Sequence, residues 1–153
     1  MDPIYNNLSP GDGRFDKDRR DRSAAMSLRI LVADDERLAA RLLAENFEDA
    51  GFETATVFSA RDAIDYIEKN RPDLVFLDVN FNAEATGMDV LRRVMTSAPE
   101  TRICLMSGYR EERRAEGMAL GAVAFIGKPA AMEDYMKVAR AAAQSLRQGR
   151  GSP

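Results

Sequence analysis

Three aspartates and one lysine stand directly after runs of apolar residues, and side chains of these types can bind a metal ion and hold an anionic group. Asp34 and Asp35 follow the first of these runs, Asp78 follows a second, and Lys128 follows the last. A short apolar run that ends in a polar residue is typical of a strand buried on both faces of a parallel sheet. In such a sheet ligands bind at the carboxyl ends of the strands. Carboxylates gathered there repel one another unless a cation joins them, and oxygen ligands suit Mg²⁺, so we expect one site with Mg²⁺ as its cofactor.

Two residue types that carry much of enzyme chemistry are scarce in this chain. There is no histidine, which excludes histidine acid/base catalysis, histidine-ligated zinc and serine–histidine triads. A phosphohistidine, if one is used, must therefore belong to another molecule. The single cysteine, Cys104, lies within an apolar run and is expected to be a buried, inert thiol.

The composition is that of an ordinary globular domain. The chain has 153 residues, of which 45% are hydrophobic and 31% charged. A net charge of -3 gives no electrostatic footprint for nucleic acid. No apolar run approaches the length of a membrane span and no signal peptide opens the chain, so we expect a cytoplasmic protein with no nucleic-acid or membrane partner.

The two ends of the chain differ in composition from its middle. Residues 1–27 hold few large apolar residues and balance five aspartates against five Lys/Arg, so we predict a disordered N-terminal tail. A tethering arm is the alternative, and Met26 is a second candidate for the initiator. Residues 149–153 are predicted to be a disordered C-terminus, which leaves one folded domain at 28–148.

The folded part alternates strand-like and helix-like segments five times. The predicted strands are 28–33, 53–58, 74–78, 102–107 and 123–127. The predicted helices are 36–50, 59–70 with Ser59 as its cap, 88–98, 111–120 and 132–148. Strict alternation predicts an α/β fold with a doubly wound parallel sheet, and the amphipathic second strand reads as an edge, which fits the order 2-1-3-4-5. That order brings the three aspartates together.

Two of the predicted helices differ in their apolar residues. The predicted buried face of the first helix consists of Leu38, Leu42, Leu43 and Phe47. The helix at 111–120 has only Met118 and Leu120 as large apolar residues, so we expect it to be poorly anchored.

Together, in order and with their spacings, these residues resemble the response regulator receiver domain of bacterial two-component signalling, in its stand-alone, single-domain form. The matching positions are Asp34, Asp35, Asp78, Ser107, Phe125 and the pair Lys128–Pro129. The resemblance covers residues 28–148 and implies a flavodoxin-like (βα)5 fold. It further implies a phosphoacceptor that at most phosphorylates itself with Mg²⁺ and slowly dephosphorylates itself, and so is not an enzyme, with a histidine kinase or histidine phosphotransferase as its partner.

The resemblance also implies a role for each site residue. Asp78 would accept the phosphoryl group. The metal site would consist of Asp35, Asp78 and the backbone carbonyl of Asn80 as direct ligands, with Asp34 contributing through a water molecule. Ser107 and Lys128 would contact the phosphoryl group, and the Lys128–Pro129 peptide would be cis. The switch positions would be Ser107, Phe125 and Tyr109. Output would be a protein contact or onward phosphoryl transfer, and an unknown output protein would bind the face made by the fourth helix, fifth strand and fifth helix.

Other interpretations of the same residues remain open. An aspartate after a strand can simply cap the next helix, which would account for Asp34 or Asp35. The chain could be a receiver-like interaction module that is not phosphorylated in use. A haloacid-dehalogenase-like phosphatase also uses an aspartyl phosphate, but its D-x-D motif follows the first strand, whereas Asp78 follows the third and position 80 is Asn. The loop 79–87 is longer than is usual for receivers, and Ala130 is smaller than the residue common there.

Overall fold

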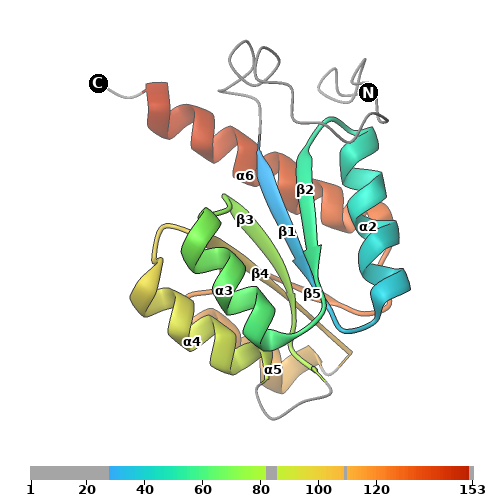
Figure 1. Cartoon of the computed structure of the whole chain (residues 1–153), viewed down its shortest axis with the longest axis vertical. Helices are drawn as coiled ribbons and strands as arrows, with labels where there is room; N and C mark the ends of the chain where they lie inside the picture. The colour runs from blue at the N-terminus through green and yellow to red at the C-terminus, as the bar shows by residue number, and fades with distance from the viewer. Residues whose placement is uncertain (1–27, 82–85, 109, 152–153) are drawn as a thin grey trace.

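The computed structural model describes residues 28–81, 86–108 and 110–151 (Figure 1). The strands in these ranges are β1 (Arg29–Ala33), β2 (Glu53–Val57), β3 (Leu74–Asp78), β4 (Arg102–Ser107) and β5 (Ala124–Gly127). The helices are α2 (Arg37–Asp49), α3 (Ala60–Asn70), α4 (Gly87–Ser97), α5 (Arg110–Leu120) and α6 (Met132–Gly151). Predictions for residues 1–27 and for Tyr109 lie outside the described residues.

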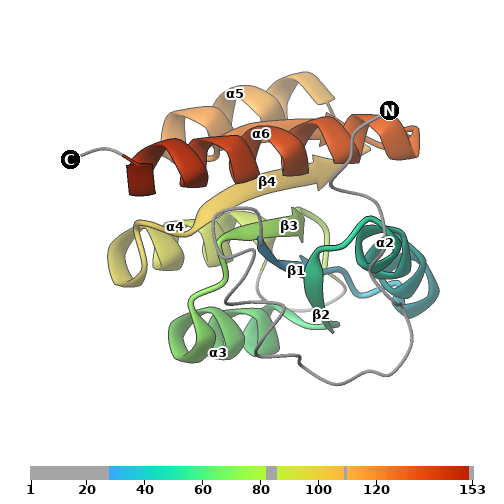
Figure 2. The same cartoon turned by 90° about the horizontal axis from the view of Figure 1, so that it is seen from above.

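The strands form one parallel sheet in the order β2-β1-β3-β4-β5, which confirms the predicted fold class and strand order. Helices cover both faces of this sheet (Figures 1 and 2). One face packs against α2 and α6, and the other packs against α3 and α4. Strand β2, at one edge, is half-buried along its whole length, as the alternating sequence predicted.

The core consists of two apolar clusters, one on each face of the sheet. Successive side chains of a strand point to opposite faces, so Ile30 and Val32 enter one cluster while Leu31 and Ala33 enter the other. This division explains why the central strands are continuous apolar runs. Cys104 is fully buried, and burial raises the pKa of its thiol to about 12, so it is the inert cysteine that was predicted.

The predicted buried face of α2 is right for Phe47, which is buried, and for Leu43, which packs against the core, but wrong for Leu38 and Leu42. Leu38 and Leu42 are exposed at 73% and 51%, whereas Ala40, Ala44 and Phe47 are buried. At 3.6 residues per turn, Leu38 and Ala40 point in directions about 200° apart, so a helix that buries Ala40 must expose Leu38. The true stripe is i, i+4, i+7 with two alanines, which let the helix approach the sheet closely.

Several helix ends differ from their predicted positions. Helix α6 continues to Gly151, three residues beyond the predicted end, so 149–151 are helical rather than part of a disordered C-terminus.

Ser59 caps α3 as predicted, because its hydroxyl accepts a hydrogen bond from the Asp62 N–H at 3.0 Å. Helix α5 approaches β4 through Gly117, where an added Cβ would overlap the Leu105 side chain. None of the helices in the described ranges is long and apolar enough to cross a membrane.

The orientation of α2 can be tested by a pair of substitutions. Ala40→Leu should lower the free energy of unfolding by about 1–3 kcal/mol, because it overpacks the interface between α2 and the sheet. Leu38→Lys should change it by no more than about 0.5 kcal/mol, because that side chain lies in solvent. Urea unfolding followed by circular dichroism measures both. The reverse ranking would restore the leucine face as the buried one.

Candidate functional site

The sheet brings the predicted site residues to one edge. Strands β1 and β3 are neighbours in which Ala33 is level with Leu77, so Asp34 and Asp78 follow side by side. Backbone pairing continues past the strand ends: the Asp34 N–H donates to the Val57 carbonyl at 3.2 Å. On the other side the Lys128 N–H donates to the Ser107 carbonyl at 2.8 Å. The convergence predicted from strand order is therefore confirmed.

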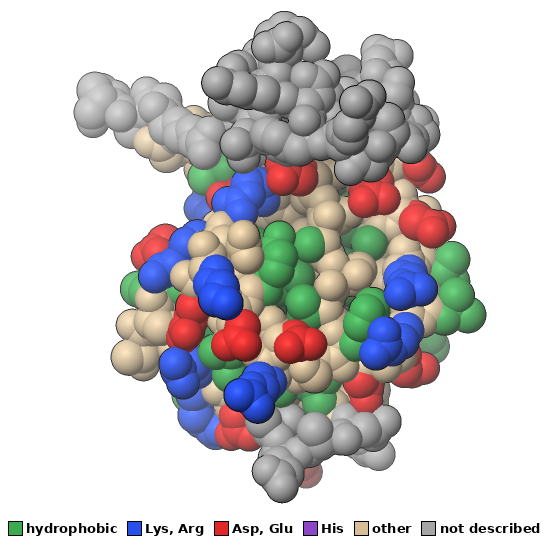
Figure 3. Space-filling model, viewed as in Figure 1, with side chains coloured by type: hydrophobic (Ala, Val, Ile, Leu, Met, Phe, Trp, Pro, Cys, Tyr) green, Lys and Arg blue, Asp and Glu red, His purple; other side chains and the backbone are tan. Residues whose placement is uncertain are grey.

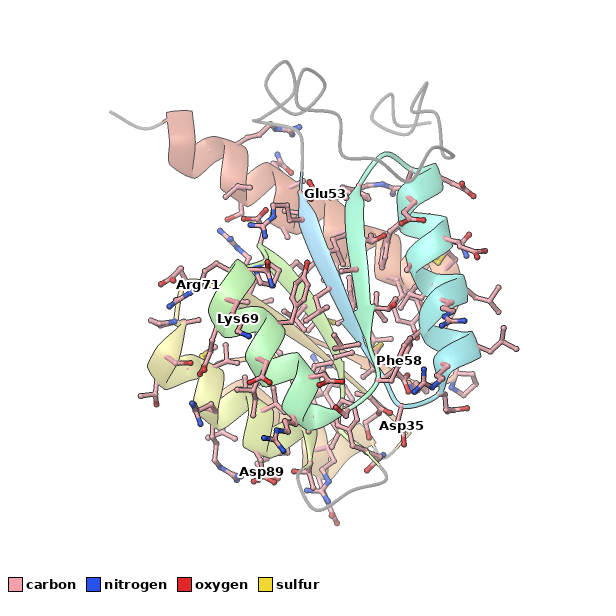
Figure 4. All side chains as sticks on the ribbon, in the orientation of Figure 1. Asp35, Glu53, Phe58, Lys69, Arg71 and Asp89 are labelled. Atoms are coloured by element: carbon pink, nitrogen blue, oxygen red, sulfur yellow. The ribbon has the colours of Figure 1, made fainter. Side chains whose placement is uncertain are left out.

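Three carboxylates meet at this edge. Asp34, Asp35 and Asp78 each offer a carboxylate oxygen, and these oxygens lie within 4.8 Å of one another. Asp34 and Asp78 are only 3% and 4% exposed, while Asp35 is half-buried at the rim. Figure 4 shows Asp35 at the carboxyl end of the sheet, close to Phe58. A cluster of this kind is costly for the protein unless positive charge is added.

Lys128 supplies part of that positive charge. Its Nζ donates to Asp34 Oδ2 at 2.9 Å and lies 3.6 Å from Asp78 Oδ1. Burial disfavours the charged ammonium, but the hydrogen bond to Asp34 and the charge of Asp78 outweigh it and raise the pKa of Lys128. The lysine therefore stays charged, and the Lys128–Pro129 peptide that holds it is cis, as the resemblance implied.

One ammonium does not compensate for all the carboxylates. Burial and the neighbouring charge of Asp34 raise the pKa of Asp78 to about 7, although the Asn80 N–H and Lys128 act in the opposite direction. The Asn80 N–H donates to Asp78 Oδ1 at 3.1 Å. Near neutral pH Asp78 is thus poised between its neutral and charged forms, and a bound cation would shift it to the charged form.

Neither Asp34 nor Asp35 is the N-cap residue of α2. Helix α2 has Glu36 at its N-cap, with no side-chain capping hydrogen bond. Asp34 Oδ1 accepts from the Glu36 N–H at 2.9 Å, which closes the turn before the helix but does not cap it. A role in the turn therefore accounts for one oxygen of Asp34 and leaves its other oxygen for Lys128.

The donor set fits Mg²⁺. Carboxylate oxygens from three side chains, two of them buried, form the oxygen-rich environment that this ion prefers. The raised pKa of Asp78 points to the same need for added positive charge. Asn80 is exposed and follows Asp78 by two residues, so its backbone carbonyl belongs to the same turn as this ligand.

The predicted switch residues lie outside the carboxylate cluster itself. Ser107 is fully buried at the end of β4, level with Gly127. Phe125 is half-buried and packs against the cluster beneath α3 and α4. Tyr109, the third predicted switch residue, lies outside the described residues.

The sequence analysis did not identify the contact that the start of α4 makes with the residues after β3. The Gly87 N–H donates to the Val79 carbonyl at 2.9 Å, and a Cβ at Gly87 would overlap the Asp78 carbonyl oxygen. Thr86 and Asp89 form a capping box at the start of α4. The signal was present in the T-G-x-D sequence, since a Thr followed three residues later by an acidic residue marks a helix start.

Comparison with known proteins points in one direction. The family described as the response regulator receiver domain matches residues 30–140. Sporulation initiation phosphotransferase F of Bacillus subtilis (strain 168) is 32% identical over 105 residues, which are 68% of this chain and 84% of that protein. The alginate biosynthesis transcriptional regulatory protein AlgB of Pseudomonas aeruginosa is 32% identical over 121 residues, 78% of this chain but only 26% of AlgB.

Solved structures show the same likeness. The receiver domain of NtrX from Brucella abortus superimposes with a TM-score of 0.71 at 33% identity, covering 76% of this chain and 98% of that one. A CheY-like receiver domain protein from Methanospirillum hungatei JF-1 gives a TM-score of 0.75 over 80% of this chain and 98% of that one. At 21% identity this second likeness concerns the fold alone.

The electrostatic cost of Asp78 can be measured. Because its folded pKa of about 7 lies above the ordinary aspartate pKa of 3.8, the free energy of unfolding of the metal-free protein should fall as pH rises between these values. Asp78→Asn removes the charge and should be more stable than wild type at pH 8 by up to about 4 kcal/mol, and the difference should shrink to about 1.5 kcal/mol at pH 5.

Asp65→Asn, an exposed substitution on α3, is the matched control and should show no such pH dependence. Urea unfolding in the presence of a chelator gives the three stability curves. An Asp78→Asn variant that is less stable than wild type at both pH values would contradict the assignment of repulsion to this residue.

Proposed function

Because the chain belongs to the response regulator receiver family, a family of phosphoacceptor signalling modules rather than enzymes, we propose that Asp78 accepts a phosphoryl group from a phosphohistidine on a partner protein. The observation that carries this proposal is the buried carboxylate of Asp78 between two further aspartates and Lys128. The sequence has no histidine to carry that phosphoryl group, and the family relationship supports a histidine kinase or histidine phosphotransferase as its donor.

In the proposed reaction a carboxylate oxygen of Asp78 attacks the phosphorus atom of the phosphohistidine. A phosphorus–oxygen bond forms, the phosphorus–nitrogen bond breaks, and its electron pair stays on the imidazole nitrogen. Asp34, Asp35, Asp78 and the Asn80 carbonyl would hold Mg²⁺. When bound, the ion would neutralise charge on the carboxylates and on the phosphoryl oxygens.

Lys128 and Ser107 would act on the phosphoryl oxygens. The ammonium of Lys128 already lies between Asp34 and Asp78. A small movement would bring it to an oxygen of a phosphoryl group attached to Asp78. Ser107 ends the neighbouring strand, and its hydroxyl would donate a hydrogen bond to another oxygen. Fixed donors of this kind stabilise charge that develops in the transition state.

The alternative, a receiver-like module that is not phosphorylated in use, would not need this set of groups. Burial and the charge of Asp34 raise the pKa of Asp78 and cost stability, and a pure binding module would have no use for such an arrangement. The retained cluster supports phosphorylation instead.

The exposed side of α2 fits the docking of the phosphoryl donor. Leu38 and Leu42 project from α2 next to the Asp35 rim, and Figure 3 shows hydrophobic side chains at the margin that α2 forms. The guanidinium of Arg37 lies 4.4 Å from the centre of the Phe58 ring and extends this surface. An apolar patch bordered by arginines suits a helical partner that carries its histidine to Asp78.

Output is proposed to leave by the face of α5, β5 and α6. Ser107 and Lys128 are joined by a backbone hydrogen bond, so a phosphoryl group that pulls on both would act on the two strands that flank α5. Phe125, half-buried on β5, would turn inward in response, and Tyr109 would modulate the lifetime of the phosphoryl group. The output partner, the domain boundaries and the cytoplasmic location stay predictions.

Labelling with acetyl phosphate and Mg²⁺ tests the acceptor. The wild-type chain should gain one acid-stable, base-labile phosphoryl group, and Asp78→Asn should gain none, while Asp65→Asn labels like wild type. Intact-mass spectrometry measures all three. A phosphoryl group on Asp78→Asn at the wild-type rate would rule out Asp78 as the acceptor.

The docking surface is tested by comparing two donors. The first donor is the histidine kinase that labels the wild-type chain fastest in a panel. From this kinase, Leu38→Asp and Leu42→Asp should accept the phosphoryl group at least about tenfold more slowly than wild type, because an apolar contact is lost. Labelling by acetyl phosphate should be unchanged, because the pocket is intact. Equal slowing with both donors would indicate damage to the pocket, and no slowing with the kinase would exclude this surface.

A further inference from the structure

A groove of about 380 Å³ lies where α6 passes over the beginning of β4 and β5, at the opposite end of the strands from Asp78. Its floor is apolar and includes Val123, Val138 and Ala142. Val123, directly before the edge strand β5, is one of the large hydrophobic side chains that lie exposed, at 50%. The volume is in the range of sites that hold a ligand or a few side chains.

Two cations border this apolar floor. Arg102 donates to the Ser145 hydroxyl at 3.2 Å, and Lys137 projects into solvent. Among the residues that the structure describes, no carboxylate lies within ion-pair distance of Arg102 or Lys137. The groove therefore offers an apolar surface with uncompensated positive charge, and an occupant should be apolar and acidic.

The first residues of the same chain have this chemistry. Residues 1–13 include Ile4, Tyr5 and Leu8 as apolar anchors, with Asp2 and Asp12 and no lysine or arginine. We propose that residues 1–13 occupy the groove between α6 and β5, with their apolar side chains on its floor and an aspartate near Arg102 and Lys137. A segment with no fold of its own can order when it binds, so this proposal is compatible with the predicted disordered tail.

The chain enters the domain close to the groove. Ile30 is level with Leu74, and Leu74 with Arg102, so Arg102 is two strand spacings, about 10 Å, from the beginning of β1. Ile30 and Cys104 belong to the cluster on the α6 face, and Arg102, two residues before Cys104, lies on that same face.

The connecting length is sufficient. Residues 14–27 separate the proposed segment from Leu28. A flexible chain of this length has a root-mean-square span of about 20 Å, which exceeds the distance to be crossed without being much longer. The tethered segment would then face the groove at an effective concentration in the millimolar range. Occupation would cover part of the face proposed for output, so an output partner would have to displace the segment.

A spin label on the segment tests the proposal in the full chain. Asn6→Cys provides the attachment site, and Cys104 does not compete for the label because it is fully buried with a pKa raised to about 12. The nitroxide should broaden the amide resonances of Val123, Ala141 and Ser145 selectively, and leave Asp65 on α3 unaffected. Leu8→Asp with the same label should abolish this broadening.

Charge reversal on the groove gives the matched comparison. Lys137→Glu, on an exposed position that is not needed for folding, should weaken the broadening, and Arg102→Glu should weaken it further. Lys69→Glu, on α3 (Figure 4), is the control and should leave it unchanged. Loss in both groove variants together with its retention in Lys69→Glu supports the proposal.

Three results would overturn it. Weak, uniform broadening over the whole surface would mean that the segment does not dock. Broadening of unlabelled, ¹⁵N-enriched chain by spin-labelled chain in a mixture would assign the groove to the segment of a second copy. If the amide resonances of the groove are unchanged by Leu8→Asp but shift when decanoate is added, the groove is a site for a small carboxylate ligand instead.

Discussion

The repulsion among buried carboxylates at the ends of β1 and β3 is the constraint on which the rest of the site depends. Two aspartates with almost no exposure face each other across adjacent strands, and one ammonium, that of Lys128, lies between them. The sheet that carries these carboxylates is covered by an apolar cluster on each face. The cluster costs stability at this edge, and in the proposed function a divalent cation and then a phosphoryl group use the site.

Strand order connects this local chemistry to more distant surfaces. The switch between β1 and β3 creates the acidic pocket, and the next two strands end in Ser107 and Lys128. Those strands form the half of the sheet that α6 covers on one face and α5 on the other. Helix α2, which begins at the same edge, carries its exposed leucines beside the pocket. In the proposed function, one edge thus receives the phosphoryl group, and the strands that end there pass on its effect.

The sequence was sufficient for the features that long-range order determines. Alternating apolar runs gave the fold and strand order, and the polar residues that end those runs gave the pocket and its lysine. It was insufficient where packing decides between similar residues. Leucines suggested that Leu38 and Leu42 belong to the buried side of α2, but the side that packs on the sheet carries the smaller Ala40 and Ala44. The demand for glycine at position 87 comes from the backbone of Asp78, a contact that no local pattern contains.

The most direct test of the central claim is the titration of Asp78 itself. Carboxyl carbon chemical shifts, assigned by comparison with Asp78→Asn, give the apparent pKa of the coupled carboxylates with and without Mg²⁺. Without metal, burial and Asp34 should hold the apparent pKa of Asp78 at about 7. Saturating Mg²⁺ should lower it by at least about two units, because the ion binds the charged form. An apparent pKa near that of a free aspartate in the absence of metal, and unmoved by Mg²⁺, would contradict the account.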